Sequence, residues 1–115
     1  MNIRFNENIL NIGEKELVLD HAILDVLETE DGILVVYDYM EYPKNLPANN
    51  LVKIDVGGKE LWKAENPTNF QTDAYTNFCR TRKYSKGTVA VNNFAGYYCE
   101  ISLSDGKLIN AEFTK

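Results

Sequence analysis

The chain has 115 residues, of which 44% are hydrophobic and 25% charged, and this balance is that of one soluble globular domain spanning residues 1–115. No apolar run approaches the roughly 18 residues of a membrane helix, and the first residues lack the pattern of a secretory signal. We therefore expect a cytoplasmic protein without a membrane segment. A net charge of −5 argues against a general nucleic-acid binder.

Glycine-containing turns separate short apolar segments at four places along the chain. Glycine supplies the positive φ that tight hairpin turns need. The four predicted hairpins join 8–12 to 16–20, 22–27 to 33–39, 51–55 to 60–63, and 97–103 to 108–113. Further strands near 74–82 and 88–91 bring the total to about ten. No window shows apolar residues at helical spacing, so we predict an all-β, mainly antiparallel domain.

The two cysteines and the single histidine make catalytic or metal chemistry a weak prospect. Without an export signal, Cys79 and Cys99 are expected to be reduced and buried, with a disulfide between neighbouring strands as the alternative. A catalytic thiol needs a base and an orienting group, and His21 lies far from both cysteines in sequence. These three residues also fall short of zinc-ligand spacing, and we predict no cofactor.

A partial internal repeat relates two of the hairpins. Leu51-Val-Lys-Ile-Asp-Val-Gly-Gly-Lys-Glu-Leu-Trp62 is similar to 99–109, and the Gly-Lys pairs are 48 residues apart. The first copy resembles the strand–turn–strand core of quinoprotein-type β-propeller blades, over about a dozen residues. A closed ring needs at least four blades, and this length holds at most about two and a half. The resemblance therefore implies a single-domain antiparallel sandwich or blade-like stacked sheets, and no quinone cofactor. Gly-Lys turns as ordinary hairpin chemistry are the alternative reading.

Charge is distributed unevenly along the chain. Residues 1–42 carry ten acids against two bases, a net charge of −8, whereas residues 43–115 carry seven acids against ten bases, a net charge of +3. The acids of the first part serve either as a solvated surface or as an acidic face that attracts a basic partner.

Two acids interrupt apolar strands of the second hairpin. If 31–32 is a two-residue turn, Asp25 lies directly opposite Asp38, an arrangement of like charges that needs water, a cation or a partner's Lys or Arg. A three-residue turn instead places Asp25 against Tyr37 or Tyr39. As a catalytic or metal-binding pair, the two carboxylates lack further active-site residues and ligands.

The aromatic residues and a basic cluster complete the candidate features. Tyr42, beside Pro43 in a proline-containing loop, is expected to be exposed, and Trp62 is expected in the core. The basic cluster 80–86 suits either phosphate contact and base stacking or neutralisation of the protein's own acidic half. Its candidate binding residues are Arg80, Arg82, Lys83 and Tyr84.

These features favour a non-enzymatic protein that binds a basic protein partner. In size, charge and architecture the chain resembles the small acidic immunity proteins that bacteria make against their own cationic nuclease toxins, including those of contact-dependent inhibition systems. The resemblance implies toxin neutralisation through an acidic, tyrosine-bearing surface. The nominated contacts are Asp25, Glu28, Glu30, Asp31, Asp38, Glu41 and Tyr42. A small β-module that binds nucleic acid or a small ligand through 80–86, an enzyme, and an assembly module are the alternatives.

Overall fold

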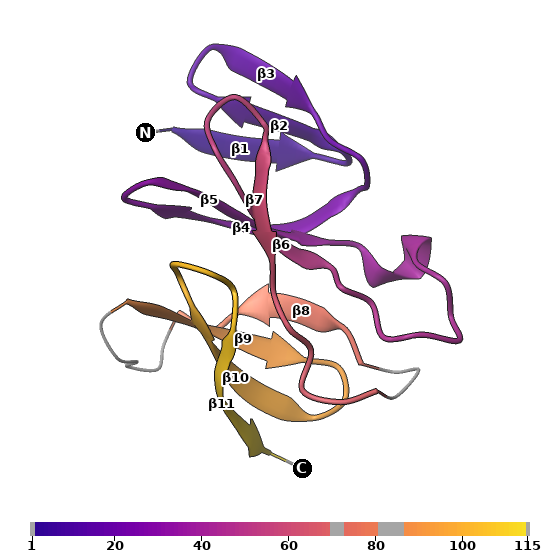
Figure 1. The fold of residues 1–115 in the computed structure, drawn as a ribbon. Helices are drawn as coiled ribbons and strands as arrows, with labels where there is room; N and C mark the ends of the chain where they lie inside the picture. The colour runs from indigo at the N-terminus through magenta and orange to yellow at the C-terminus, as the bar shows by residue number, and fades with distance from the viewer. Residues whose placement is uncertain (1, 70–72, 81–86, 115) are drawn as a thin grey trace.

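A computed structural model describes residues 2–69, 73–80 and 87–114, and these ranges form three antiparallel sheets stacked in layers (Figure 1). The first sheet contains β1 (Ile3–Asn6), β2 (Ile9–Ile12) and β3 (Lys15–Val18). The second contains β4 (Ile23–Thr29), β5 (Gly32–Tyr37), β6 (Leu51–Ile54) and β7 (Glu60–Lys63). The third contains β8 (Tyr75–Phe78), β9 (Thr88–Asn93), β10 (Tyr97–Ser102) and β11 (Leu108–Phe113). The 3-10 helix η1 (Tyr39–Glu41) follows β5.

The second sheet lies between the other two and is covered on both faces. Every residue of β5 and β6 is buried. On one face, Leu34, Val36 and Leu51 pack against β8, β9 and β10 of the third sheet. On the other face, Val35 and Val52 pack with Leu10 of the first sheet. The core therefore consists of two apolar layers with the second sheet between them, which explains why β5 is apolar throughout and β6 is apolar except for Lys53.

Asn50 joins the second sheet to the third with its fully buried side chain. Its Nδ2 donates to the carbonyl oxygens of Tyr37 (2.8 Å) and Tyr75 (2.7 Å), and its Oδ1 accepts from the Tyr75 backbone N–H (2.9 Å). The amide thus satisfies backbone groups of β5 and β8 that would otherwise lack strand partners.

The three sheets have equivalent glycine-containing turns, and in the second and third sheets this turn is contacted by the sheet before it. The turns after β2, β6 and β10 each hold a glycine at positive φ, Gly13, Gly58 and Gly106. Four residues after the first two glycines stand Leu17 and Trp62. Leu17 of the first sheet packs on Gly58: a Cβ added to this glycine would lie 3.6 Å from Leu17 Cδ1. Trp62 of the second sheet packs on Gly106 in the same way. The residue four after Gly106 is Asn110, which is exposed.

All four predicted hairpins and the all-β class are confirmed. The β2–β3 hairpin has the same strand–turn–strand form as the two predicted copies, but its similarity is hidden in the sequence because Gly13-Glu14-Lys15 lacks the adjacent Gly-Lys pair. It also missed β1. The segment predicted over 74–82 is strand only in β8, and residues 81 and 82 lie outside the described ranges.

The turn between β4 and β5 corrects the predicted charge pair. Thr29 pairs with Gly32, so the two turn residues are Glu30 and Asp31, and Gly32 belongs to the strand. Asp25 consequently faces Val36 rather than Asp38, Tyr37 or Tyr39, and β5 ends before Asp38. Gly32 is in the strand because it packs on Lys53: a Cβ there would lie 3.1 Å from Lys53 Cε and 2.7 Å from the Ile54 carbonyl oxygen.

Gly106→Ala should destabilise the protein much more than Gly13→Ala. Both glycines have positive φ, which costs an alanine about 1–2 kcal/mol. Only at Gly106 would the new Cβ collide, at 2.5 Å from Trp62 Cε3 and 3.0 Å from the Lys63 carbonyl oxygen, whereas nothing lies within 4 Å at Gly13. We expect a further loss of about 1–3 kcal/mol at Gly106, measured by urea unfolding. Equal losses would contradict the packing of Trp62 on this turn.

Candidate functional site

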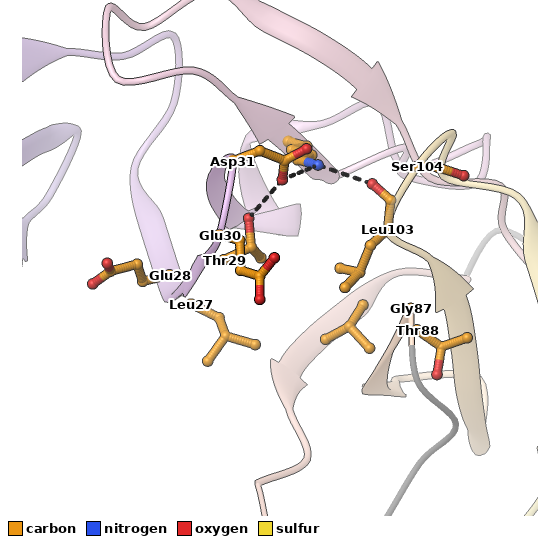
Figure 2. Close-up of a pocket in the computed structure, with 11 residues that line it drawn as sticks. Leu27, Glu28, Thr29, Glu30, Asp31, Gly87, Thr88, Leu103 and Ser104 are labelled. Carbon is orange, nitrogen blue, oxygen red and sulfur yellow. Dashed lines mark hydrogen bonds and ion pairs between the residues drawn. The ribbon is translucent and has the colours of Figure 1, made fainter.

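A cleft of about 890 Å³ opens between the second and third sheets, at the end of the molecule that holds the β4–β5 turn (Figure 2). We call it the inter-sheet cleft. Three apolar side chains, Leu27, Val89 and Leu103, contribute its apolar surface, and Leu27 and Leu103 point into the gap in the close-up. The remaining lining residues are Glu28, Thr29, Glu30, Asp31, Lys53, Gly87, Thr88 and Ser104.

Lys53 is the buried cation of the inter-sheet cleft. It is 3% exposed, and its Nζ contacts Asp31 Oδ1 at 2.7 Å and donates to the Leu103 carbonyl oxygen at 3.0 Å. The same carbonyl oxygen accepts from Trp62 Nε1 at 3.1 Å. The hydrogen bond from Lys53 lowers the pKa of Asp31, and desolvation opposes this effect without cancelling it. Lys53 thus connects the β4–β5 turn to the third sheet. Because its side chain is buried, its ammonium group needs these two partners in place of water.

The rim of the inter-sheet cleft is acidic. Among the described residues, its lining carries three carboxylates, Glu28, Glu30 and Asp31, and the ammonium of Lys53, which together have a net charge of −2. Asp31 is engaged by Lys53, whereas Glu30 is exposed at the tip of the turn. An apolar floor below carboxylates suits a long basic side chain, whose methylenes pack on apolar surface while its charge stays at the rim.

Of the seven predicted contacts, Glu28, Glu30 and Asp31 line the inter-sheet cleft together, and the others lie elsewhere. Asp38, Glu41 and Tyr42 lie beyond the other end of β5, which at about 3.3 Å per residue is roughly 20 Å long. The seven nominated residues therefore do not form one patch. Lys53, Val89 and Leu103 were missed, and the one local signal was a lysine inside the otherwise apolar strand 51–54.

Asp25 and Arg80 form an ion pair that joins the second and third sheets. Arg80 Nη1 and Nη2 donate to Asp25 Oδ2 and Oδ1, both at 2.9 Å, and Nη2 also donates to the Val26 carbonyl oxygen at 2.7 Å. Asp25 additionally accepts from the backbone N–H groups of Phe78 and Val26. The hydrogen bonds that Arg80 donates to Asp25 raise the pKa of Arg80. Arg80 therefore neutralises an acid of its own chain.

The rest of the predicted basic cluster lies outside the described ranges. This applies to Arg82, Lys83, Tyr84 and Lys86. With Arg80 engaged by Asp25, the described part of the cluster offers no free guanidinium for phosphate.

At the opposite end, the nominated residues have structural roles. Asp38 Oδ1 accepts from the Met40 N–H and so caps η1, and Glu41 Oε1 contacts His21 Nδ1 at 3.2 Å. The prediction that Tyr42 is exposed is wrong: it is half-buried, and its ring lies 4.7 Å from that of His21. Burial raises the pKa of Tyr42, and it raises that of Tyr37 to about 12.

Cys79 and Cys99 are not joined in a disulfide. Burial raises the pKa of Cys99 to about 12, so this thiol stays protonated at neutral pH. Within the described ranges, no three His, Cys, Asp or Glu side chains are grouped as metal ligands, and no helix is long and apolar enough to cross a membrane.

Asp25→Ala should cost more stability than Arg80→Ala. Removing the carboxylate leaves the Phe78 N–H without its acceptor, so we expect a loss of about 1–3 kcal/mol in the free energy of unfolding. Arg80 is 51% exposed and Asp25 keeps its backbone donors without it, so that loss should stay below about 1 kcal/mol. Urea unfolding followed by Trp62 fluorescence measures both, and equal losses would contradict this account.

Lys53→Met should raise the pKa of Asp31 toward its ordinary value. A carboxyl with a depressed folded pKa stabilises the fold above its unfolded pKa, and this contribution is lost as pH falls through the folded pKa. The wild type should therefore lose stability below about pH 4, and Lys53→Met should lose less there. Carboxyl NMR titration measures the shift, with the exposed Lys15→Met as the control. An unchanged Asp31 titration in Lys53→Met would refute the pairing.

Comparison with known proteins gives a family without an assigned role. Among solved structures, the chain is similar to the computationally designed protein Ika8, with 15% identity and a TM-score of 0.46. That match covers 98% of this chain and 48% of the designed one, so this chain spans about half its length. No curated protein matches the chain. The model of a domain of unknown function, DUF7957, matches residues 1–113, and the chain therefore belongs to the DUF7957 family.

Proposed function

We propose that the protein is a non-enzymatic protein-binding module whose inter-sheet cleft receives a basic segment of a partner. The observation that carries this proposal is the combination of an apolar floor with an acidic rim in one opening of about 890 Å³. A lysine or arginine side chain entering this opening would place its stem on Leu27, Val89 and Leu103. Its charge would lie near Glu30 and Asp31.

The buried ammonium of Lys53, at the inter-sheet cleft, already has hydrogen-bond partners within the chain. Lys53 is held by Asp31 and by the Leu103 carbonyl oxygen, so the opening does not need an anion to neutralise its buried ammonium. The net negative charge of the protein would attract a cationic partner over a long range and so raise its rate of association. These features favour a basic partner over an acidic one.

The composition of the chain supports one class of partner. A small protein with a net charge of −5 and an acidic opening suits a cationic toxin domain of a bacterial system, neutralised in the cytoplasm as small acidic immunity proteins do. In this proposal Glu28, Glu30 and Asp31 form the contact. Asp25, Asp38, Glu41 and Tyr42 support the fold instead, and charge reversal at Asp25 would therefore report on stability rather than on binding.

Glu30→Lys should weaken binding of a basic probe by about tenfold, because it reverses the charge at the rim. The probe is a labelled hexa-arginine peptide, titrated by fluorescence anisotropy at low and at physiological salt. Glu16→Lys on β3 makes the same change in net charge away from the opening, and we expect less than a twofold effect.

NMR chemical-shift mapping places the probe on the protein. Shifts concentrated at Leu27, Val89 and Leu103 would support the proposal. Equal weakening by Glu30→Lys and Glu16→Lys, or shifts confined to the opposite end of the molecule, would overturn it. Co-purification with the product of a neighbouring toxin gene, lost in Glu30→Lys and kept in Glu16→Lys, tests the partner class.

A further inference from the structure

The first sheet has three strands, whereas the second and third have four each (Figure 1). The turns after β2, β6 and β10 are equivalent, so β1 corresponds to β5 and β9. In the second and third sheets, β4 and β8 pair with these strands on the side away from β6 and β10. Among the described residues, no strand takes the corresponding place beside β1. We call this open side of β1 the β1 edge.

Phe5 shows what the missing neighbour leaves uncovered. It corresponds to Leu34 and Ala90, because all three lie on the row of cross-strand partners that ends four residues after the turn glycine. Leu34 pairs with Leu27, and the Ala90 carbonyl oxygen accepts from the Cys79 N–H at 2.9 Å. Leu34 and Ala90 are 0% exposed, whereas Phe5 is 38% exposed. A fourth strand would therefore cover Phe5 as β4 and β8 cover its equivalents.

The backbone groups available at the β1 edge belong to Ile3 and Phe5. The Glu7 carbonyl oxygen points away from β2, since it accepts from the N–H of Ile23 in β4 at 2.8 Å. In an antiparallel pair, alternate residues point to the same side, so Phe5 and Ile3 also direct their N–H and C=O groups outward. Within the described ranges, no strand pairs with these groups.

The other sheet edges differ from the β1 edge. Register shifts interrupt the pairing of β7 and of β11. β3 corresponds to β7 and β11, which are themselves edges, so the other sheets show no strand in the place beside it. The outer edges of β4 and β8 lie next to each other. β1 pairs regularly with β2 from Ile3 to Asn6, and both of its equivalents have a further neighbour. This edge is therefore suited to strand addition.

The charge at one end of the β1 edge favours a basic segment. Glu7 and Asp20 are exposed there, and together with Glu41 they supply the three carboxylates of a pocket of about 350 Å³. Arg4 points to the face of the sheet opposite to Phe5, because neighbouring residues of a strand alternate between faces. Positive side chains arriving beside Glu7 would therefore meet carboxylates, and acidic ones would be repelled.

We propose that an extended segment of a basic partner protein pairs antiparallel with β1 and completes the first sheet as its fourth strand. The positive charge of this partner rests on the proposed function, but the surface is a different one from the inter-sheet cleft. The segment takes the place beside β1 that β4 and β8 take beside β5 and β9.

The edge also defines the pattern of the segment. Its residues opposite Phe5 and Ile3 face the second sheet, where Ile3 and Val26 are partly buried against the core, so they should be apolar. Ile23 already donates to the Glu7 carbonyl oxygen, so pairing ends at Phe5. The residues that precede the paired part then lie near Glu7 and should be basic. The expected pattern is thus basic residues followed by apolar residues at alternate positions.

A labelled peptide, Lys-Lys-Thr-Val-Thr-Val-Thr, is the probe, and fluorescence anisotropy at low salt measures its binding. Its two valines are placed opposite Phe5 and Ile3. The same peptide with N-methylated valines lacks the two N–H groups aimed at β1 and should bind about tenfold more weakly or worse. A peptide with two glutamates in place of the lysines should also bind more weakly.

Proline variants test the edge from the protein side. Phe5→Pro removes an outward N–H without removing a bond to β2, and should weaken peptide binding by about tenfold relative to Phe5→Ala, which loses the ring alone. Val18→Pro is the matched control on β3. Val18 also points outward, because the next residue, Leu19, donates to the Asn8 carbonyl oxygen across the hairpin. This variant should bind as the wild type does, and circular dichroism checks that each variant is folded.

Amide hydrogen exchange of the wild type gives a readout that needs no variant. Saturating peptide should slow the exchange of the Ile3 and Phe5 N–H groups, which have no strand partner in the free protein. The Val18 N–H, on the opposite edge of the same sheet, should exchange at an unchanged rate.

Several results would overturn this inference. They are the absence of peptide binding up to millimolar concentration, equal binding of the N-methylated peptide, equal weakening by Phe5→Pro and Val18→Pro, or unchanged exchange at Ile3 and Phe5. A dimer of the free protein that Phe5→Pro dissociates would assign the edge to a second copy instead. Hexa-arginine binding that ignores Glu30→Lys would count against the inter-sheet cleft alone, provided that the valine peptide still protects the two amides.

Discussion

The burial of the second sheet on both faces is the constraint on which the rest of the structure depends. Its two central strands, β5 and β6, are buried along their whole length, so every polar group that they carry must find a partner inside the protein. Lys53 lies in the fully buried strand β6, and Asn50 directly precedes that strand. Both find their partners in the third sheet, at the Leu103 carbonyl oxygen and at Tyr75. The groups that burial forces inward are thus among those that hold the layers together.

The hairpins were predictable because their signals are local. Each combines a glycine turn with short apolar segments, and all four appear in the structure. The exact position of the β4–β5 turn was not predictable from the same signals. Asp31-Gly32 looks like a turn pair, but Gly32 is placed in β5 by its contact with Lys53, a residue of another strand. That tertiary contact moved the register, and with it the predicted opposition of Asp25 and Asp38.

The candidate site shows the same division between local and distant information. The acidic turn 28–31 was visible in the sequence, but the apolar floor comes from Val89 and Leu103, which reach the turn only through the stacking of two sheets. The uneven distribution of charge along the chain also serves contacts within the protein. Asp25 and Asp31 of the acidic part are matched by Arg80 and Lys53 of the basic part, so some of that asymmetry joins the sheets rather than facing a partner.

The central position of the second sheet also bears on how such a fold can change in evolution. In arrays whose units contact only their neighbours, a unit can be added or lost with little effect on the others. Here the removal of either outer layer would expose one whole side of β5 and β6, whose residues are all buried. The three layers should therefore melt as one unit, and a shortened descendant retaining only two of them would need new polar residues along the uncovered strands before it could remain folded.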